Sequence, residues 1–157
     1  MNQIMVKKKE WLRLTNSLYN RHDIESGVYA IFKTSSCINS KKLLVTQVII
    51  PEDKDYHKRS AARVAFTPEF TEKAFKICEA NRGHLMDIHT HPWSGNVNFS
   101  PVDDREAIKT KLPYMNRYLP ETLIAFIVFG SNENIAKARF WDKEKNRLLD
   151  INRIVVI

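Results

Sequence analysis

The chain has 157 residues, 43% of them hydrophobic and 27% charged, which is typical of one globular domain, expected here to span residues 1–157. No apolar run reaches the roughly 18 residues that a membrane span needs, and the lysine-rich start lacks the apolar segment of a secretory signal, so we expect a cytoplasmic protein with no membrane partner. The formal net charge of +7 comes from scattered basic residues without an aromatic-interleaved stripe, which argues against nucleic acid as a functional partner.

Hydrophobic periodicity predicts alternating helices and strands along the chain. Trp11, Leu14 and Leu18 recur at helical spacing and predict an amphipathic helix over residues 8–21. A proline-containing cap predicts a second helix over 68–81, and Pro113 is expected to end a third helix that begins at Pro101. Strands are predicted over residues 27–33, 42–50, 61–66, 84–90, 122–129, 135–141 and 148–156, with a polar turn over 34–41 and a charged loop over 51–59.

This interleaving of helices and strands predicts the α/β class, with one sheet covered by helices on its faces. The strand over 122–129 is the most apolar, so we expect it near the centre of the sheet.

The segment from His89 to Asp103 carries the strongest functional signal. His89 and His91 are two residues apart at the end of a predicted strand, so both imidazoles leave the same face. Ser100 and Pro101 begin a helix, and Asp103 lies in its first turn. Two imidazoles facing a carboxylate form a three-ligand set typical of catalytic zinc, which leaves one position for water. Taken singly, His-x-His on a strand and Ser-Pro-x-Asp at a helix start are more often structural.

These residues, together with Glu25 ahead of a glycine-containing strand, resemble the JAMM motif of the JAB/MPN metalloprotease domains. The family usually has six residues between His-Pro and the serine, whereas this chain has seven, from Trp93 to Phe99. Both Asp103 and Asp104 therefore come into question as the carboxylate ligand, and the spacing from Ser100 favours Asp103.

The resemblance implies a cytidine-deaminase-like fold, a mixed sheet flanked by helices, and one Zn²⁺ per chain. It implies that His89, His91 and Asp103 are the metal ligands, and that zinc activates water for attack. Glu25 would act as the general base and then the general acid, and the Ser100 hydroxyl would stabilise the oxyanion.

Several other residues receive weaker expectations. Asp87 shares the strand face of His89, so it is expected to orient an imidazole. Trp93 lies beside the ligands and is either a lid for a substrate tail or a plug of the core. The remaining histidines, His22, His57 and His84, have no metal-ligand spacing to the site. The cysteines, Cys37 and Cys78, lack C-x-x-C spacing and are expected to be free thiols.

The resemblance implies a peptidase or isopeptidase that cleaves after the C-terminal tail of a ubiquitin-like or sulfur-carrier protein. Stand-alone bacterial members act beside E1-like and E2-like partners, some of them in antiphage conjugation operons. Two alternatives stay open: a catalytically silent MPN scaffold, and a nucleic-acid-associated protein of the RadC type. A zinc nucleoside deaminase would need H-x-E and P-C-x-x-C, which are absent here.

Overall fold

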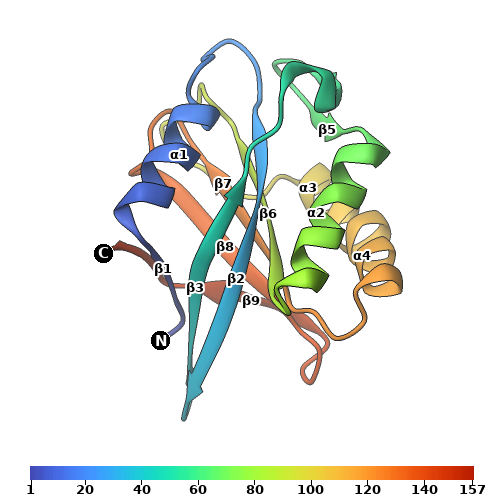
Figure 1. The fold of residues 1–157 in the computed structure, drawn as a ribbon. Coiled ribbons are helices and arrows are strands. Elements are labelled where there is room, and N and C mark those ends of the chain that lie inside the picture. The colour runs from blue at the N-terminus through green and yellow to red at the C-terminus, as the bar shows by residue number, and fades with distance from the viewer.

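The computed structural model describes residues 1–157 as one α/β domain built on an eight-stranded mixed sheet, with a separate two-stranded sheet beside it (Figure 1). The strands are β1 (Gln3–Val6), β2 (Gly27–Cys37), β3 (Ser40–Ile49), β4 (Tyr56–Arg59), β5 (Val64–Phe66), β6 (His84–Thr90), β7 (Ile124–Phe129), β8 (Ala136–Asp142), β9 (Arg147–Ile151) and β10 (Arg153–Val156). The large sheet has the order β10-β1-β3-β2-β6-β7-β8-β9, in which β1 runs parallel to β10 and β3, and β6 runs parallel to β7.

Helices cover both faces of this sheet, as predicted (Figure 1). Helix α1 (Lys8–Leu18) packs on one face, and α2 (Pro68–Ala80) lies on the other with α3 (Pro101–Glu106) and α4 (Leu112–Tyr118). Each face has its own buried apolar cluster, one containing Leu14 and Leu18 and the other containing Phe70 and Met115. Strand β7 is buried at every position and lies inside the sheet, which confirms its predicted place. None of the helices is long and apolar enough to cross a membrane.

The expected helix end before Pro113 is wrong, because the chain stays helical to Tyr118. A π-helical segment, Ala107–Lys111, separates α3 from α4, and the Leu112 N–H donates to the Ala107 carbonyl, five residues earlier. Proline lacks an N–H and its ring clashes with the carbonyl four residues before it in a regular α-helix. The wider π turn changes the backbone hydrogen-bond pattern just ahead of Pro113, so the helix can continue through the proline. Such π-bulges often lie at functional sites.

The hairpin β2–β3 is longer than predicted. The residues expected to form a polar turn over 34–41 instead extend both strands, leaving only Ile38 and Asn39 between Cys37 and Ser40. Asn39 has a φ of 60°, a left-handed conformation that asparagine tolerates. This outer part of the hairpin is largely exposed on both faces, so it carries no alternation of apolar residues that would have predicted strand.

The end of the chain forms two strands where one was predicted over 148–156. Strands β9 and β10 are separated by Asn152 alone, yet they lie at opposite ends of the strand order. The Asn152 carboxamide oxygen accepts the Asn2 N–H at 2.8 Å, which joins this turn to the start of β1, a short strand that was not predicted. The large sheet therefore curls until its two edges meet at Asn152.

The hairpin β4–β5 lies over the start of β2 and borders the site. Part of it, β4, was expected to be loop, and β5 begins later than predicted. A Cβ at Gly27 would lie 2.8 Å from the tip of the Phe66 ring, so a larger residue would force that ring to shift. The Tyr56 hydroxyl lies 3.2 Å from the Gly27 N–H nitrogen and 3.1 Å from the Gly27 carbonyl oxygen, which fixes the hairpin against β2.

Candidate metal centre

His89 and His91 lie together at the carboxyl end of β6, where the parallel strand β7 also ends. Their ring centroids are 5.0 Å apart at an interplanar angle of 65°. The backbone N–H of His91 donates to the Phe129 carbonyl at 2.7 Å, which continues the pairing with β7 past the last residue of β6. Ligand sites in α/β proteins occur preferentially at this edge of a sheet.

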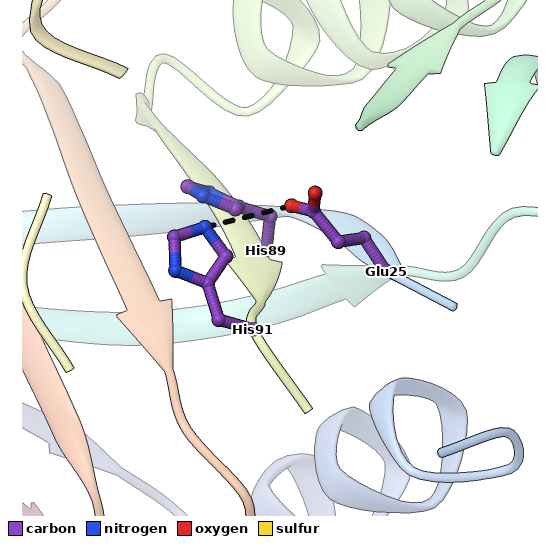
Figure 2. A group of neighbouring side chains, drawn as sticks. All are labelled: Glu25, His89 and His91. Atoms are coloured by element: carbon purple, nitrogen blue, oxygen red, sulfur yellow. Dashed lines mark ion pairs between the residues drawn. The ribbon is translucent and has the colours of Figure 1, made fainter. Parts of the chain in front are cut away.

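Glu25 reaches the same place from the segment that precedes β2. The Ser26 N–H donates to the Thr90 hydroxyl at 2.9 Å, and the Thr90 N–H donates to the Ser26 carbonyl at 3.0 Å. Arg59 donates from Nε to the Glu25 carbonyl at 3.0 Å. The main chain around Glu25 is thus fixed, and its Oε1 lies 3.6 Å from His91 Nε2 (Figure 2).

Asp103 approaches the imidazoles from the first turn of α3. Its Oδ2 accepts the Ser100 N–H at 2.9 Å, while the Ser100 hydroxyl accepts the Asp103 N–H at 3.0 Å, a reciprocal capping box. Asp103 Oδ1 lies 3.4 Å from His89 Nε2, and Oδ2 lies 3.7 Å from His91 Nε2. The helix cap that the sequence predicted also aims the carboxylate.

Asp104 is engaged elsewhere, even though the loop before α3 has one residue more than the family pattern. Its Oδ1 lies 2.6 Å from Arg139 Nη1 on β8. The same guanidinium lies 3.7 Å above the Phe99 ring, and Val97 is buried within the loop. The carboxylate that faces both imidazoles is therefore that of Asp103 and not that of Asp104.

The donor set fits a metal ion. The ligand atoms of Glu25, His89 and His91 all lie within 4.8 Å of one another, and Asp103 contacts both imidazoles. His89 Nε2 is buried and has no hydrogen-bond partner. A buried polar atom without a partner is costly in a folded protein. Imidazoles and carboxylates are ligands that zinc and other transition metals accept.

The electrostatics of the cluster separate its two carboxylates. Burial, and then the charge of Asp103, raise the pKa of Glu25 to about 8, although Lys111 opposes this shift. Burial would also raise the pKa of Asp103, but the adjacent imidazoles hold it well below its usual range. Burial and the neighbouring His89 lower the pKa of His91. Asp103 is therefore ionised and His91 neutral near pH 7, as metal ligation requires, while Glu25 exchanges a proton near neutrality.

The cluster lies in a cavity of about 270 Å³, named here the histidine pocket. A second cavity of about 310 Å³, the side pocket, adjoins it. Both are lined by Arg63, Val64, His89, Glu106 and Lys111, and the histidine pocket is also lined by Glu25, His91, Trp93, Ser100, Val102 and Asp103. The walls of the side pocket include Tyr29, Phe66, Asp87, Tyr114 and Met115.

The expectation that Asp87 orients an imidazole is wrong. Asp87 Oδ2 accepts from Lys111 Nζ at 2.9 Å, so its carboxylate is paired with the π-helical segment. Although burial would lower the pKa of Lys111, the Asp87 carboxylate raises it above its usual range. Sequence reasoning missed Lys111, Arg63 and Glu106, because a lone charge on a helix or strand resembles an ordinary surface residue. Arg63 and Glu106, which line both pockets, form an ion pair at 3.3 Å.

The other histidines lie apart from this cluster. His84 Nδ1 accepts the Leu123 N–H at 2.9 Å, and His22 stacks on Tyr19. Cys37 and Cys78 are free, as expected.

Comparison with known proteins bears on the fold and not on the chemistry. Neither a protein-family model nor a curated protein matches the sequence. Among solved structures, the chain is similar to the solution structure of protein DSY2949 from Desulfitobacterium hafniense, with a TM-score of 0.55. The alignment covers 98% of this chain and 92% of that one at 12% identity, so the likeness is evidence for the fold alone.

Proposed function

We propose that this protein is a zinc-dependent amide hydrolase of the JAB/MPN type. One observation carries the proposal: Glu25, the His89–His91 pair and Asp103 converge from three separate segments on one pocket, where the buried His89 Nε2 has no other partner. These residues, with Ser100 beside them, match all five elements of the JAMM motif, with one residue more in the loop before the serine than is usual. A chance cluster of acids and histidines would not be expected to reproduce both that pattern and the capping box that aims Asp103.

In this proposal His89, His91 and Asp103 hold the zinc. Asp103 is assigned as the third ligand because it contacts both imidazoles, whereas Glu25 contacts only His91. Bound there, zinc supplies Lewis-acid polarisation and activation of water at neutral pH.

The protein's own groups then handle the proton and the developing charge. Glu25 accepts a proton from the attacking water and delivers it to the leaving amine, a role open to a carboxyl group that lies 3.6 Å from His91 Nε2. The Ser100 hydroxyl already accepts the Asp103 N–H, and its own hydrogen remains free to donate to the oxyanion of the tetrahedral intermediate.

The surroundings suit an extended acyl tail. Strand β5 pairs only with β4, so its second edge is free, and Val64 and Ala65 of that strand line the side pocket. Extended peptides often bind by adding a strand to such an edge. We assign as substrate the C-terminal tail of a ubiquitin-like or sulfur-carrier protein, released from a peptide or isopeptide bond. E1-like and E2-like proteins of a cytoplasmic conjugation system, including antiphage systems, are the corresponding partners.

The test combines metal content with cleavage. Purified protein should contain zinc and cleave a ubiquitin-like protein fused through its tail to a reporter, and chelation should abolish cleavage that added zinc restores. Zinc-loaded protein that cleaves no ubiquitin-like tail would favour the alternative of a silent MPN scaffold, and protein that binds no zinc would contradict the proposal.

A further inference from the structure

Trp93 forms an exposed surface at the rim of the histidine pocket. The residue is 55% exposed, which excludes the role of a core plug. Its ring stacks on that of His91, with 5.9 Å between centroids and an interplanar angle of 8°. Large exposed aromatic rings beside a pocket are frequent contact residues for ligands.

The main chain that carries Trp93 is held firmly. The Ser94 N–H donates to the His91 carbonyl at 3.0 Å, closing a turn around Trp93. The Ser94 carbonyl in turn accepts the Ser131 N–H at 2.8 Å. A Cβ at Gly130 would lie 2.6 Å from the Ser94 oxygen, so this turn packs directly on the end of β7. The main chain that carries the exposed ring is therefore fixed on the end of β7.

The two ends of a substrate can be placed by the groups that must act on them. Glu25 has to reach the leaving amine, and its carboxylate lies against His91. The side pocket is lined by His89 but by neither Glu25 nor His91. The acyl side therefore lies toward the side pocket and β5, and the amine side lies toward His91, where Trp93 is found. Val102, which is 50% exposed, lines the histidine pocket together with Trp93 and adds apolar surface there.

We infer that Trp93 is a specificity-determining residue that packs against the alkyl chain attached to the scissile nitrogen. The inference rests on the proposed function and adds the recognition of the amine side to it. A flat aromatic face gains from contact with methylene groups, which are otherwise hydrated. Such a chain is either the side-chain methylenes of a lysine in an isopeptide or the apolar side chain of the residue after a peptide bond.

The test uses three amides that share one ubiquitin-like acyl tail and differ in the amine: the ε-amine of Nα-acetyl-lysine amide, the α-amine of leucine amide and the α-amine of glycine amide. Trp93→Ala should lower kcat/KM for the lysine and leucine substrates roughly tenfold, which corresponds to about 1.4 kcal/mol, and change the glycine substrate less than about twofold. Whichever of the two alkyl substrates loses more identifies the preferred source. Trp93→Phe should restore most of the loss because the ring is kept.

Leu12→Ala is the matched control, since Leu12 is 50% exposed on α1, on the opposite face of the sheet, and lies outside both pockets. It should leave all three substrates unchanged, and all variants should retain zinc. An equal loss on all three substrates with Trp93→Ala would overturn the inference, because it would show that the ring only supports His91. Unchanged cleavage would overturn it too, with the proposed function intact. A wild-type protein that cleaves none of the amides would instead refute the proposed function, and this inference with it.

Discussion

Asp103 and His89 face one another, with Oδ1 of the aspartate 3.4 Å from Nε2 of the histidine, while Oδ2 of the same carboxylate caps α3 through the Ser100 N–H. One carboxylate thus fixes the start of a helix and faces the end of a strand. A substitution that keeps the capping oxygen but removes the charge can therefore test metal binding while the N-terminus of α3 stays intact.

Asp103→Asn should reduce the zinc content from about one ion per chain to near zero, because a neutral amide is a poor zinc ligand. The amide oxygen can still accept the Ser100 N–H, so the cap is kept and the melting temperature of the chelated protein should change little. Metal analysis after dialysis, together with thermal unfolding, provides the measurement. Asp104→Asn is the matched control and should keep its zinc, because Asp104 pairs with Arg139. Full zinc retention by Asp103→Asn would contradict the ligand assignment.

The sequence predicted those site residues that lie close together along the chain. His89, His91, Ser100 and Asp103 lie in one stretch with fixed spacing, and strand and capping rules place them on a common edge. Glu25 was found only through family resemblance, because no local rule relates it to β6. The ion pair of Asp87 with Lys111 could not be predicted, because a π-helical turn ahead of a proline decides which way that lysine points.

The fold shows the same division. Helices with caps and strands with apolar runs were found, whereas the short strand β1 and the hairpin strand β4 were missed. Both lack a long apolar pattern. Strand β1 forms because β3 and β10 pair with it from distant parts of the chain, whereas β4 forms by pairing with the nearby β5. The split at Asn152 likewise depends on the curl of the whole sheet.

Glu25→Gln should keep zinc and the fold but lower cleavage by roughly 10²- to 10⁴-fold, the usual effect of losing a general acid–base group. Glutamine has nearly the same shape and lacks a titratable proton. Zinc content, melting temperature and kcat on one tail fusion should be compared with those of the wild type. A variant that loses its zinc would instead make Glu25 a ligand, which its 3.6 Å contact with His91 allows geometrically. A zinc-loaded variant with wild-type kcat would remove Glu25 from the mechanism.

The same substitution predicts a pH-dependent gain of stability in chelated protein. The folded-state pKa of Glu25 is raised to about 8, whereas an unfolded glutamate titrates near 4.3. A group with a raised folded pKa contributes its stability at low pH and loses it as the pH rises through that interval. After metal removal with a chelator, Glu25→Gln should therefore unfold at a higher denaturant concentration than the wild type at pH 8. The corresponding gain in the free energy of unfolding is on the order of a few kcal/mol. The difference should vanish near pH 4. A pH-independent difference would show that the charge of Glu25 is not its cause.

The pairing of Asp87 with Lys111 predicts unequal costs for removing its two members. The Asp87 side chain is 5% exposed and the Lys111 side chain is 33% exposed. Lys111→Met leaves a buried carboxylate without a partner and should destabilise the protein by about 3 kcal/mol, as measured for other broken buried pairs. Asp87→Asn leaves an ammonium group that can turn toward water, so its cost should be about 1 kcal/mol.

The measurement is urea unfolding of both variants and of the double variant, which should cost less than the sum of the single changes. Lys76→Met removes one member of the exposed Glu72–Lys76 pair and should change stability by less than about 0.5 kcal/mol. If Lys111→Met lowers the free energy of unfolding no more than Lys76→Met does, the Asp87–Lys111 ion pair does not stabilise the fold. If the two single changes at that pair cost the same, burial of the carboxylate does not control its energetics.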